Sequence, residues 1–204
     1  MTDSSHPTPR TEGEDYTERL TTLASARWKQ VLDVQRPYRW NLRRLHLGRT
    51  LDVGCGIGRN LVNLGSNSVG VDHNPTSIAA CRAQGLEAYT TEEFRSTDIG
   101  APGAFDALLA AHLLEHVDEQ VADDILAEYL PSVRPGGQVV LICPQEKGFD
   151  SDATHTRFCD LDTMRAHAER HGLTVERAYS FPFPRMAGKV FTYNEFVMVG
   201  RLPG

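Results

Sequence analysis

The feature that most constrains the fold is a short apolar strand that runs directly into three glycines. The segment LDVGCGIG at residues 51–58 places Gly54, Gly56 and Gly58 after this strand. Glycine lets the backbone turn sharply and approach a ligand, and a following helix would supply N–H donors. The next strand ends in Asp72, where an acid can accept hydrogen bonds from both ribose hydroxyls of a nucleotide. The order of strand, turn, helix, strand and acid predicts a nucleoside site.

The same residues also have a purely structural interpretation. The three glycines would then form only a tight turn, and Asp72 would cap the next helix. We favour the nucleoside site because all of its elements occur in order. The dinucleotide fingerprint is G-x-G-x-x-G, whereas the glycines here run G-x-G-x-G. This spacing disfavours a pyrophosphate ligand.

Strands and helices alternate from Arg49 onward. The expected strands are 50–53, 68–71, 87–90, 105–111 and 138–143, and the expected helices are 60–64, 75–84 and 121–130. Such alternation predicts a parallel sheet covered by helices on both faces. A helix at 161–171, capped by Asp160 and closed by Gly172, precedes strands 174–180 and 191–200. Because no helix separates these two strands, we expect an antiparallel pair at the sheet edge.

The chain divides into three parts. Residues 1–15 are polar, lack periodicity and predict a disordered tail. Residues 16–47 carry apolar side chains at helical spacing and predict an N-terminal helical lid, with a break at Pro37 and a second helix at 38–45. Residues 48–204 form the main α/β domain.

The composition excludes several classes of protein. No apolar run approaches the about 20 residues that a membrane span needs, and the first residues lack the pattern of a secretory signal. The formal net charge of −6 argues against a nucleic-acid partner held by bulk charge. Four cysteines without a CxxC pair indicate reduced thiols. We therefore expect a cytoplasmic protein without a membrane or nucleic-acid partner.

Four segments carry a resemblance to a known family. LDVGCGIGRN, VGVDHNP, FDALLAAHLLEHV and PSVRPGGQVVLICP occur in this order within residues 49–144. They resemble the successive motifs of class I S-adenosylmethionine-dependent methyltransferases. The resemblance implies S-adenosylmethionine as cofactor and a Rossmann-like, doubly wound, mostly parallel seven-stranded sheet with an antiparallel last strand. It also implies that residues 48–204 are the methyltransferase domain, and it leaves the acceptor open.

The resemblance further implies a set of cofactor-binding residues. The three glycines would line the methionine and ribose portions, and Asp72 would bind the ribose hydroxyls. His73 would pack on the adenine, and Glu92 would contact its amino group. Arg59 could bind the donor carboxylate or remain a surface charge. The full set is Asp52, which supports the loop, Gly54, Gly56, Gly58, Arg59, Asp72, His73, Glu92 and Ala111, which lies near the donor methyl group.

A histidine-rich segment follows the fourth expected strand. His112, Glu115 and His116 would lie on one face if the segment were helical. The segment reads H-x-x-E-H, a zinc-hydrolase signature, but it stands where the methyltransferases have their LEHV stretch. An accessory divalent ion such as Mg²⁺, held by Glu115 and His116, is the alternative that we keep open.

Methyl transfer mainly requires that donor and acceptor be oriented. A hydroxyl acceptor must also lose a proton, and histidine is well suited to accept it near neutral pH. The candidates are His116, His155 and His112. No [DNS]-P-P-[YFW] motif, typical of nucleobase amino methylation, follows the fourth strand, which favours an oxygen acceptor.

The function predicted from the sequence is methyl transfer to a hydroxyl of a small polar acceptor. A saccharide is our first choice, because of the histidines and the aromatic Trp28, Tyr38 and Trp40 in the lid. A phenol, a quinone or a carboxylate is the alternative acceptor. The rival functions are a nicotinamide-dependent oxidoreductase and a non-catalytic cofactor-binding protein. A homodimer is left open.

Overall fold

The computed structural model describes residues 35–204. The expected tail at 1–15, most of the expected lid and Trp28 lie outside the described residues. Within this range the chain forms one seven-stranded sheet in the order β3-β2-β1-β4-β5-β7-β6. The strands are β1 (Thr50–Val53), β2 (Val69–Asp72), β3 (Ala88–Thr90), β4 (Phe105–Ala111), β5 (Val133–Pro144), β6 (Thr174–Phe181) and β7 (Glu195–Arg201).

The strand directions confirm the predicted fold class. Strands β1 to β5 pair in parallel, and β7 lies antiparallel to both β5 and β6. The pair formed by β6 and β7 is the antiparallel pair expected from the missing helix between them. Strand β7 begins at Glu195 rather than at residue 191, because the preceding residues form a loop with one short helical turn.

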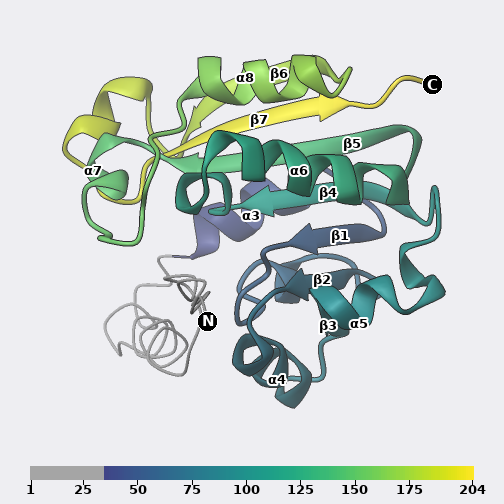
Figure 1. Cartoon of the computed structure of the whole chain (residues 1–204). Helices are drawn as coiled ribbons and strands as arrows, with labels where there is room; N and C mark the ends of the chain where they lie inside the picture. The colour runs from purple at the N-terminus through teal and green to yellow at the C-terminus, as the bar shows by residue number, and fades with distance from the viewer. Residues whose placement is uncertain (1–34) are drawn as a thin grey trace, which may run out of the picture.

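Helices cover both faces of the sheet. They are α3 (Arg36–Arg44), α4 (Pro75–Ala83), α5 (Thr91–Arg95), α6 (Glu119–Tyr129), α7 (Glu146–Phe149) and α8 (Leu161–Arg170). Single 3-10 turns are η1 (Leu61–Asn63), η2 (Asp98–Gly100), η3 (Leu114–His116), η4 (Leu130–Ser132) and η5 (Arg185–Lys189). Figure 1 shows α6 and α8 in front of the sheet and α3 behind it.

Alternating side chains of the central strands fill two separate cores. Leu108 and Ala110 of β4 pack in the core that contains residues of α6 and α8, whereas Ala107 and Leu109 pack with residues of α3. A strand that is apolar on both faces must be covered on both faces. This burial is why the β4 sequence is almost continuously apolar.

One predicted helix is wrong. The expected helix at 60–64 is only the turn η1, because this short segment contains asparagines and a valine, which favour a helix weakly, and Gly65 follows it. The helix expected at 38–45 is confirmed as α3, which begins slightly earlier, at Arg36, and has Pro37 in its first turn, where the missing N–H costs nothing. The caps expected for α8 are confirmed, since the Asp160 side chain accepts from the Thr163 N–H and Gly172 has φ of 70°.

The carboxyl ends of the parallel strands meet at one edge of the sheet. In Figure 1 this edge is on the left, where the arrows of β1 and β4 end and α7 lies beyond β5. Ligands bind at this edge in open α/β sheets. None of the helices in the described range is long and apolar enough to span a membrane.

Candidate functional site

The glycine loop folds tightly over the end of β2. The N–H groups of Gly54 and Cys55 both donate to the Val71 carbonyl, at 2.8 and 3.1 Å. Gly54, Gly56 and Gly58 have φ of 74°, 52° and 83°, which is the left-handed region that glycine adopts without strain. A Cβ on Gly54 would lie 3.0 Å from the Leu113 side chain, so the loop also abuts the segment that follows β4. The loop therefore needs glycine for its backbone and for its close packing.

We predict that Gly58→Ala destabilises the protein more than Gly85→Ala. Both glycines have positive φ, but a Cβ on Gly85 meets nothing within 4 Å, whereas one on Gly58 lies 2.5 Å from Leu86 and 3.1 Å from Cys81. Backbone strain alone should cost about 1 kcal/mol at Gly85. Overpacking should raise the loss of unfolding free energy in Gly58→Ala to about 3 kcal/mol. Urea unfolding of the two variants measures this difference, and equal losses would contradict the packing argument.

Asp72 ties the glycine loop to the turn before α4. Its Oδ2 accepts from the Gly56 N–H at 2.9 Å, and its Oδ1 accepts from the Asn74 N–H at 2.9 Å. The side chain that caps α4 is that of Asn74, which accepts from the Thr76 N–H. Each Asp72 oxygen keeps a further lone pair for a ligand hydroxyl. Asp72 is thus oriented at the end of β2 as ribose binding would require.

Asp52 lies under the loop with an unsatisfied oxygen. Burial, together with the negative charge of Asp72, raises the pKa of Asp52 to about 8. Among the described residues, its Oδ2 has no hydrogen-bond partner. A buried acceptor without a donor is costly, and a donor group on a ligand would remove that cost. The orphaned oxygen and the glycine loop fit a ligand that carries a ribose and a hydrogen-bond donor, as S-adenosylmethionine does.

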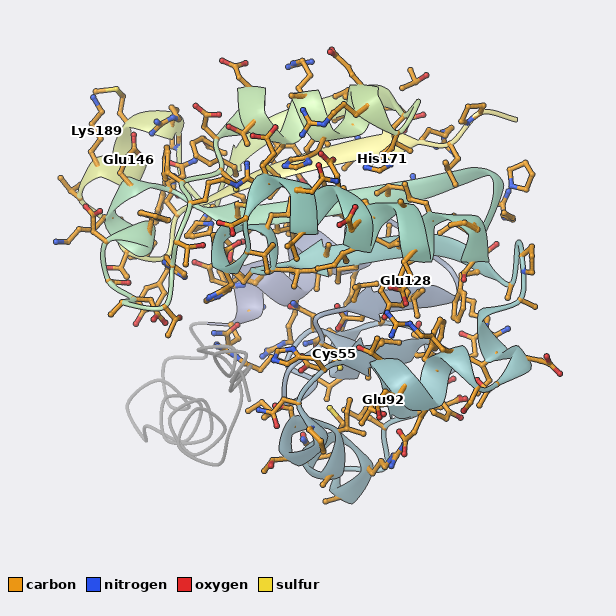
Figure 2. All side chains as sticks on the ribbon, viewed as in Figure 1. Cys55, Glu92, Glu128, Glu146, His171 and Lys189 are labelled. Atoms are coloured by element: carbon orange, nitrogen blue, oxygen red, sulfur yellow. The ribbon has the colours of Figure 1, made fainter. Side chains whose placement is uncertain are left out.

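The other residues expected to bind the cofactor differ in their position and in their exposure to solvent. The His73 Nδ1 is 3.5 Å from Asp72 Oδ1, and Ala111 ends β4 in a buried position. Glu92 lies in the first turn of α5, just after β3, and is labelled there in Figure 2. Arg59 is exposed after the loop. The contacts of these four residues with a cofactor stay predictions.

His112 is held between two carboxylates. It has φ of 56°, its Nδ1 is 3.1 Å from Glu115 Oε1, and its Nε2 is 3.0 Å from Glu195 Oε1. Burial opposes protonation, but the bonds to Glu115 and Glu195 outweigh it and raise the pKa of His112 to about 10. A protonated imidazole has no lone pair with which to accept another proton. The helical face expected for 112–116 is reduced to the single turn η3.

His116 and His155 meet at the carboxyl ends of β4 and β5. Their ring centroids are 4.8 Å apart. The His155 Nδ1 is 2.7 Å from the Phe149 carbonyl oxygen, and the His116 Nδ1 is 3.3 Å from that of Thr154. Because a carbonyl only accepts, each Nδ1 carries a proton. Burial lowers the pKa of His116, so its ring is neutral at pH 7 and its Nε2 keeps a lone pair.

Glu115 completes a group that could hold a metal ion. Ligand atoms of Glu115, His116 and His155 all lie within 4.8 Å of one another. The side chain of Glu115 is fully buried, and among the described residues its Oε2 has no hydrogen-bond partner. The sequence pointed to Glu115 and His116 as ligands, but only the fold adds His155 to them.

A buried polar network holds the loop that carries His155. His167 of α8 lies 2.7 Å from Asp123 of α6 through Nδ1 and 2.8 Å from Arg157 through Nε2. The backbone N–H groups of Thr156 and Arg157 both donate to the Glu115 carbonyl. In the sequence, His167 is one position of the expected helix at 161–171. Nothing in its local pattern identifies Arg157 and Asp123 as its partners.

We expect His167→Leu to destabilise the protein by about 3 kcal/mol, because it leaves Arg157 and Asp123 without their shared partner. His171→Leu, which loses one bond to Asp123, should cost about 1 kcal/mol. Burial lowers the pKa of His167, so folding favours its neutral form. The contribution of His167 should thus be complete above pH 6.5 and decline as the pH falls. Thermal unfolding of both variants at two pH values tests this.

Comparison with known proteins supports the same fold and cofactor class. Residues 51–141 match the family model of a methyltransferase domain. A ubiquinone biosynthesis O-methyltransferase of Xanthomonas oryzae pv. oryzae is 33% identical over 101 residues, which cover 46% of this chain and 41% of that protein. One of Rhodopseudomonas palustris is 25% identical over 165 residues, which cover 69% of this chain and 64% of that protein. The chain thus spans less than two thirds of either relative.

A solved structure shares the fold. A SAM-dependent methyltransferase from Archaeoglobus fulgidus superposes with a TM-score of 0.63 at 18% identity, over 84% of this chain and 99% of that one. At this identity the likeness speaks for the fold alone, whereas the family match covers the glycine loop, Asp72 and the segment of His112 and His116. Residues 51–141 therefore resemble a methyltransferase domain in sequence, and the described chain has the fold of a SAM-dependent methyltransferase.

Proposed function

We propose that this protein transfers a methyl group from S-adenosylmethionine to a hydroxyl of a small acceptor. The observation that carries the proposal is the pair of histidines, His116 and His155, whose rings meet at the carboxyl ends of β4 and β5. The glycine loop reaches the same edge of the sheet through its packing against Leu113. Donor and acceptor can therefore meet beside a group that accepts protons.

In this proposal each residue of the site has a distinct role. The cofactor supplies a methyl group on a positively charged sulfur. The glycine loop and Asp72 hold its ribose, and Asp52 supports the loop from beneath. His116, through Nε2, accepts the hydroxyl proton as the acceptor oxygen attacks, and the Thr154 carbonyl fixes the ring beside the acceptor. His112 acts as a cation between Glu115 and Glu195 rather than as the proton acceptor.

We propose an aromatic hydroxyl, on a phenol or a hydroquinone, as the acceptor group. The Phe149 ring stacks on His155 with centroids 5.3 Å apart, and Phe149 also contacts Phe158. An aromatic acceptor ring packs favourably against aromatic side chains such as these. The matched Xanthomonas and Rhodopseudomonas proteins are O-methyltransferases of ubiquinone biosynthesis. The saccharide expected from the sequence gains no support from either source and becomes the comparison arm of the test.

The test is a screen of acceptors with S-adenosylmethionine labelled in its methyl group. Catechols and hydroquinones should become labelled at oxygen, and simple sugars should not. Labelled sugars would overturn the aromatic acceptor but keep hydroxyl methylation. Binding of S-adenosylhomocysteine without transfer to any acceptor would support the non-catalytic alternative, and a hydride transfer with a nicotinamide would support the oxidoreductase.

A divalent ion is the second way in which the same cluster could activate a hydroxyl. Glu115, His116 and His155 supply one carboxylate and two imidazoles, a set that transition metals accept more readily than Mg²⁺ does. We predict that the histidines act without an ion, so that dialysis against a chelator changes the turnover number less than twofold. A loss that Zn²⁺ or Mg²⁺ restores would contradict this prediction.

A further inference from the structure

Two buried thiols lie directly beneath the glycine loop, and methyl transfer does not use them. Cys55 stands between Gly54 and Gly56, and Cys81 belongs to α4. Both sulfurs contact the Gly56 carbonyl oxygen, at 3.6 Å for Cys55 and 3.2 Å for Cys81. The two thiols therefore share one acceptor oxygen. Figure 2 shows Cys55 between the sheet and the helix below it.

We propose that Cys55 and Cys81 are a site of reversible oxidation by peroxide, and that the disulfide they form weakens cofactor binding. The proposal rests on the assignment of the glycine loop to S-adenosylmethionine. It gives the thiols a role outside the transfer reaction itself.

The chemistry needs only a peroxide as co-reactant. The Cys81 thiolate attacks one oxygen of hydrogen peroxide, the O–O bond breaks, and a sulfenic acid and a hydroxide result; the hydroxide becomes the first water by taking up the proton that the Cys81 thiol released. The Cys55 sulfur then attacks the Cys81 sulfur, the S–O bond breaks, and the hydroxide that leaves becomes the second water by taking up the Cys55 thiol proton. In sum two thiols lose two protons and two electrons, and the peroxide gains them. The neighbouring Cys55 lowers the pKa of Cys81 against the effect of burial, which favours Cys81 as the first nucleophile.

The position of the pair explains why a disulfide would disturb the loop. A disulfide holds its sulfurs about 2.05 Å apart, closer than two thiols in van der Waals contact can come. Cys81 is fully buried in α4, whose first turn is fixed by the Asn74 cap. The movement must therefore fall mainly on Cys55 and on its neighbour Gly56, whose N–H is bonded to Asp72. Loss of that bond removes the link that orients Asp72 for the ribose.

The chain contains a second thiol pair that serves as a matched control. Cys143 and Cys159 both lie in the main core with at most 1% exposure. The Cys159 thiol donates to the Arg157 carbonyl, away from the glycine loop. Cys55 is 7% exposed and lies in the loop that must admit the cofactor. A cofactor bound there would cover the first pair and leave the second unaffected.

The experiment exposes the reduced full-length protein to hydrogen peroxide, with and without S-adenosylhomocysteine. Peptide mapping then identifies the cross-linked cysteines, and calorimetry measures the affinity for S-adenosylhomocysteine. We expect a disulfide between Cys55 and Cys81, a loss of affinity of about tenfold or more, and recovery with dithiothreitol. Bound S-adenosylhomocysteine should slow the cross-link. Cys55→Ser and Cys81→Ser should make the affinity insensitive to peroxide, and Cys159→Ser should leave the response intact.

The outcomes separate this inference from the proposed function. Thiols that remain reduced at 55 and 81 while Cys143 and Cys159 cross-link would overturn the inference, as would a disulfide that changes the affinity less than twofold. If a serine variant does not fold, the alanine variant at the same position replaces it. Failure of the untreated, reduced protein to bind S-adenosylhomocysteine would contradict the cofactor assignment and, with it, the effect that we infer for the disulfide.

Discussion

Asp72→Ala is expected to weaken the binding of S-adenosylhomocysteine by about 100-fold or more. The change removes the acceptor of the Gly56 and Asn74 N–H bonds and, in our proposal, the acceptor of the ribose hydroxyls. Hydrogen bonds to a charged group are worth about 1.5 to 3 kcal/mol each, so the loss of one or two of them gives this range. Calorimetric titration of the purified variant measures the effect.

Asp106→Asn is the matched control for this change. Asp106 lies at the other end of the sheet, where it accepts from the Arg49 N–H and from Arg134. Its loss should lower stability slightly and leave the affinity for S-adenosylhomocysteine within twofold. If both variants lost affinity equally, general destabilisation would explain the result, and the role given to Asp72 would be wrong.

His116→Gln is expected to lower the turnover number by about 10² to 10⁴, the usual contribution of a positioned acid or base. Glutamine keeps a polar group of similar size but cannot accept the hydroxyl proton. Affinity for S-adenosylhomocysteine should change less than threefold, because the change lies outside the glycine loop. Steady-state kinetics with saturating donor separates the two quantities.

The pH profile adds a test of the same assignment. Burial lowers the pKa of His116, so the neutral ring that accepts a proton is fully populated above pH 6.5. The turnover number of the wild type should therefore be constant from pH 7 upward and decline only below pH 6.5. His112→Gln serves as a comparison, since His112 is already protonated at these pH values. An acid limb that persists unchanged in His116→Gln would assign the proton acceptor to another group.

The sheet could be predicted from the sequence because its signals are local. Three such signals each have one simple structural explanation: the apolar run at 105–111, the glycines after Val53 and the missing helix before β7. The helix expected at 60–64 was predicted wrongly because its local signal is weak. A short polar segment after a glycine loop has little preference for a helix, and it forms only the turn η1.

The site could be predicted only in part, because its key contacts join distant segments. His116 and His155 are 39 positions apart and meet only when the loop after β5 folds back onto the Glu115 carbonyl. The Glu195 that faces His112 comes from β7, and the partners of His167 come from α6 and the same loop. No spacing in the sequence encodes these pairings.

Methyl transfer to an oxygen can be measured directly on the product. The protein is incubated with a catechol and with S-adenosylmethionine carrying a ¹³C methyl group, and the product is examined by NMR. We expect the wild type to form a product with a labelled methoxy carbon, and His116→Gln to form much less of this product. A methyl group on nitrogen or carbon, or no transfer by a protein that binds S-adenosylhomocysteine, would contradict it.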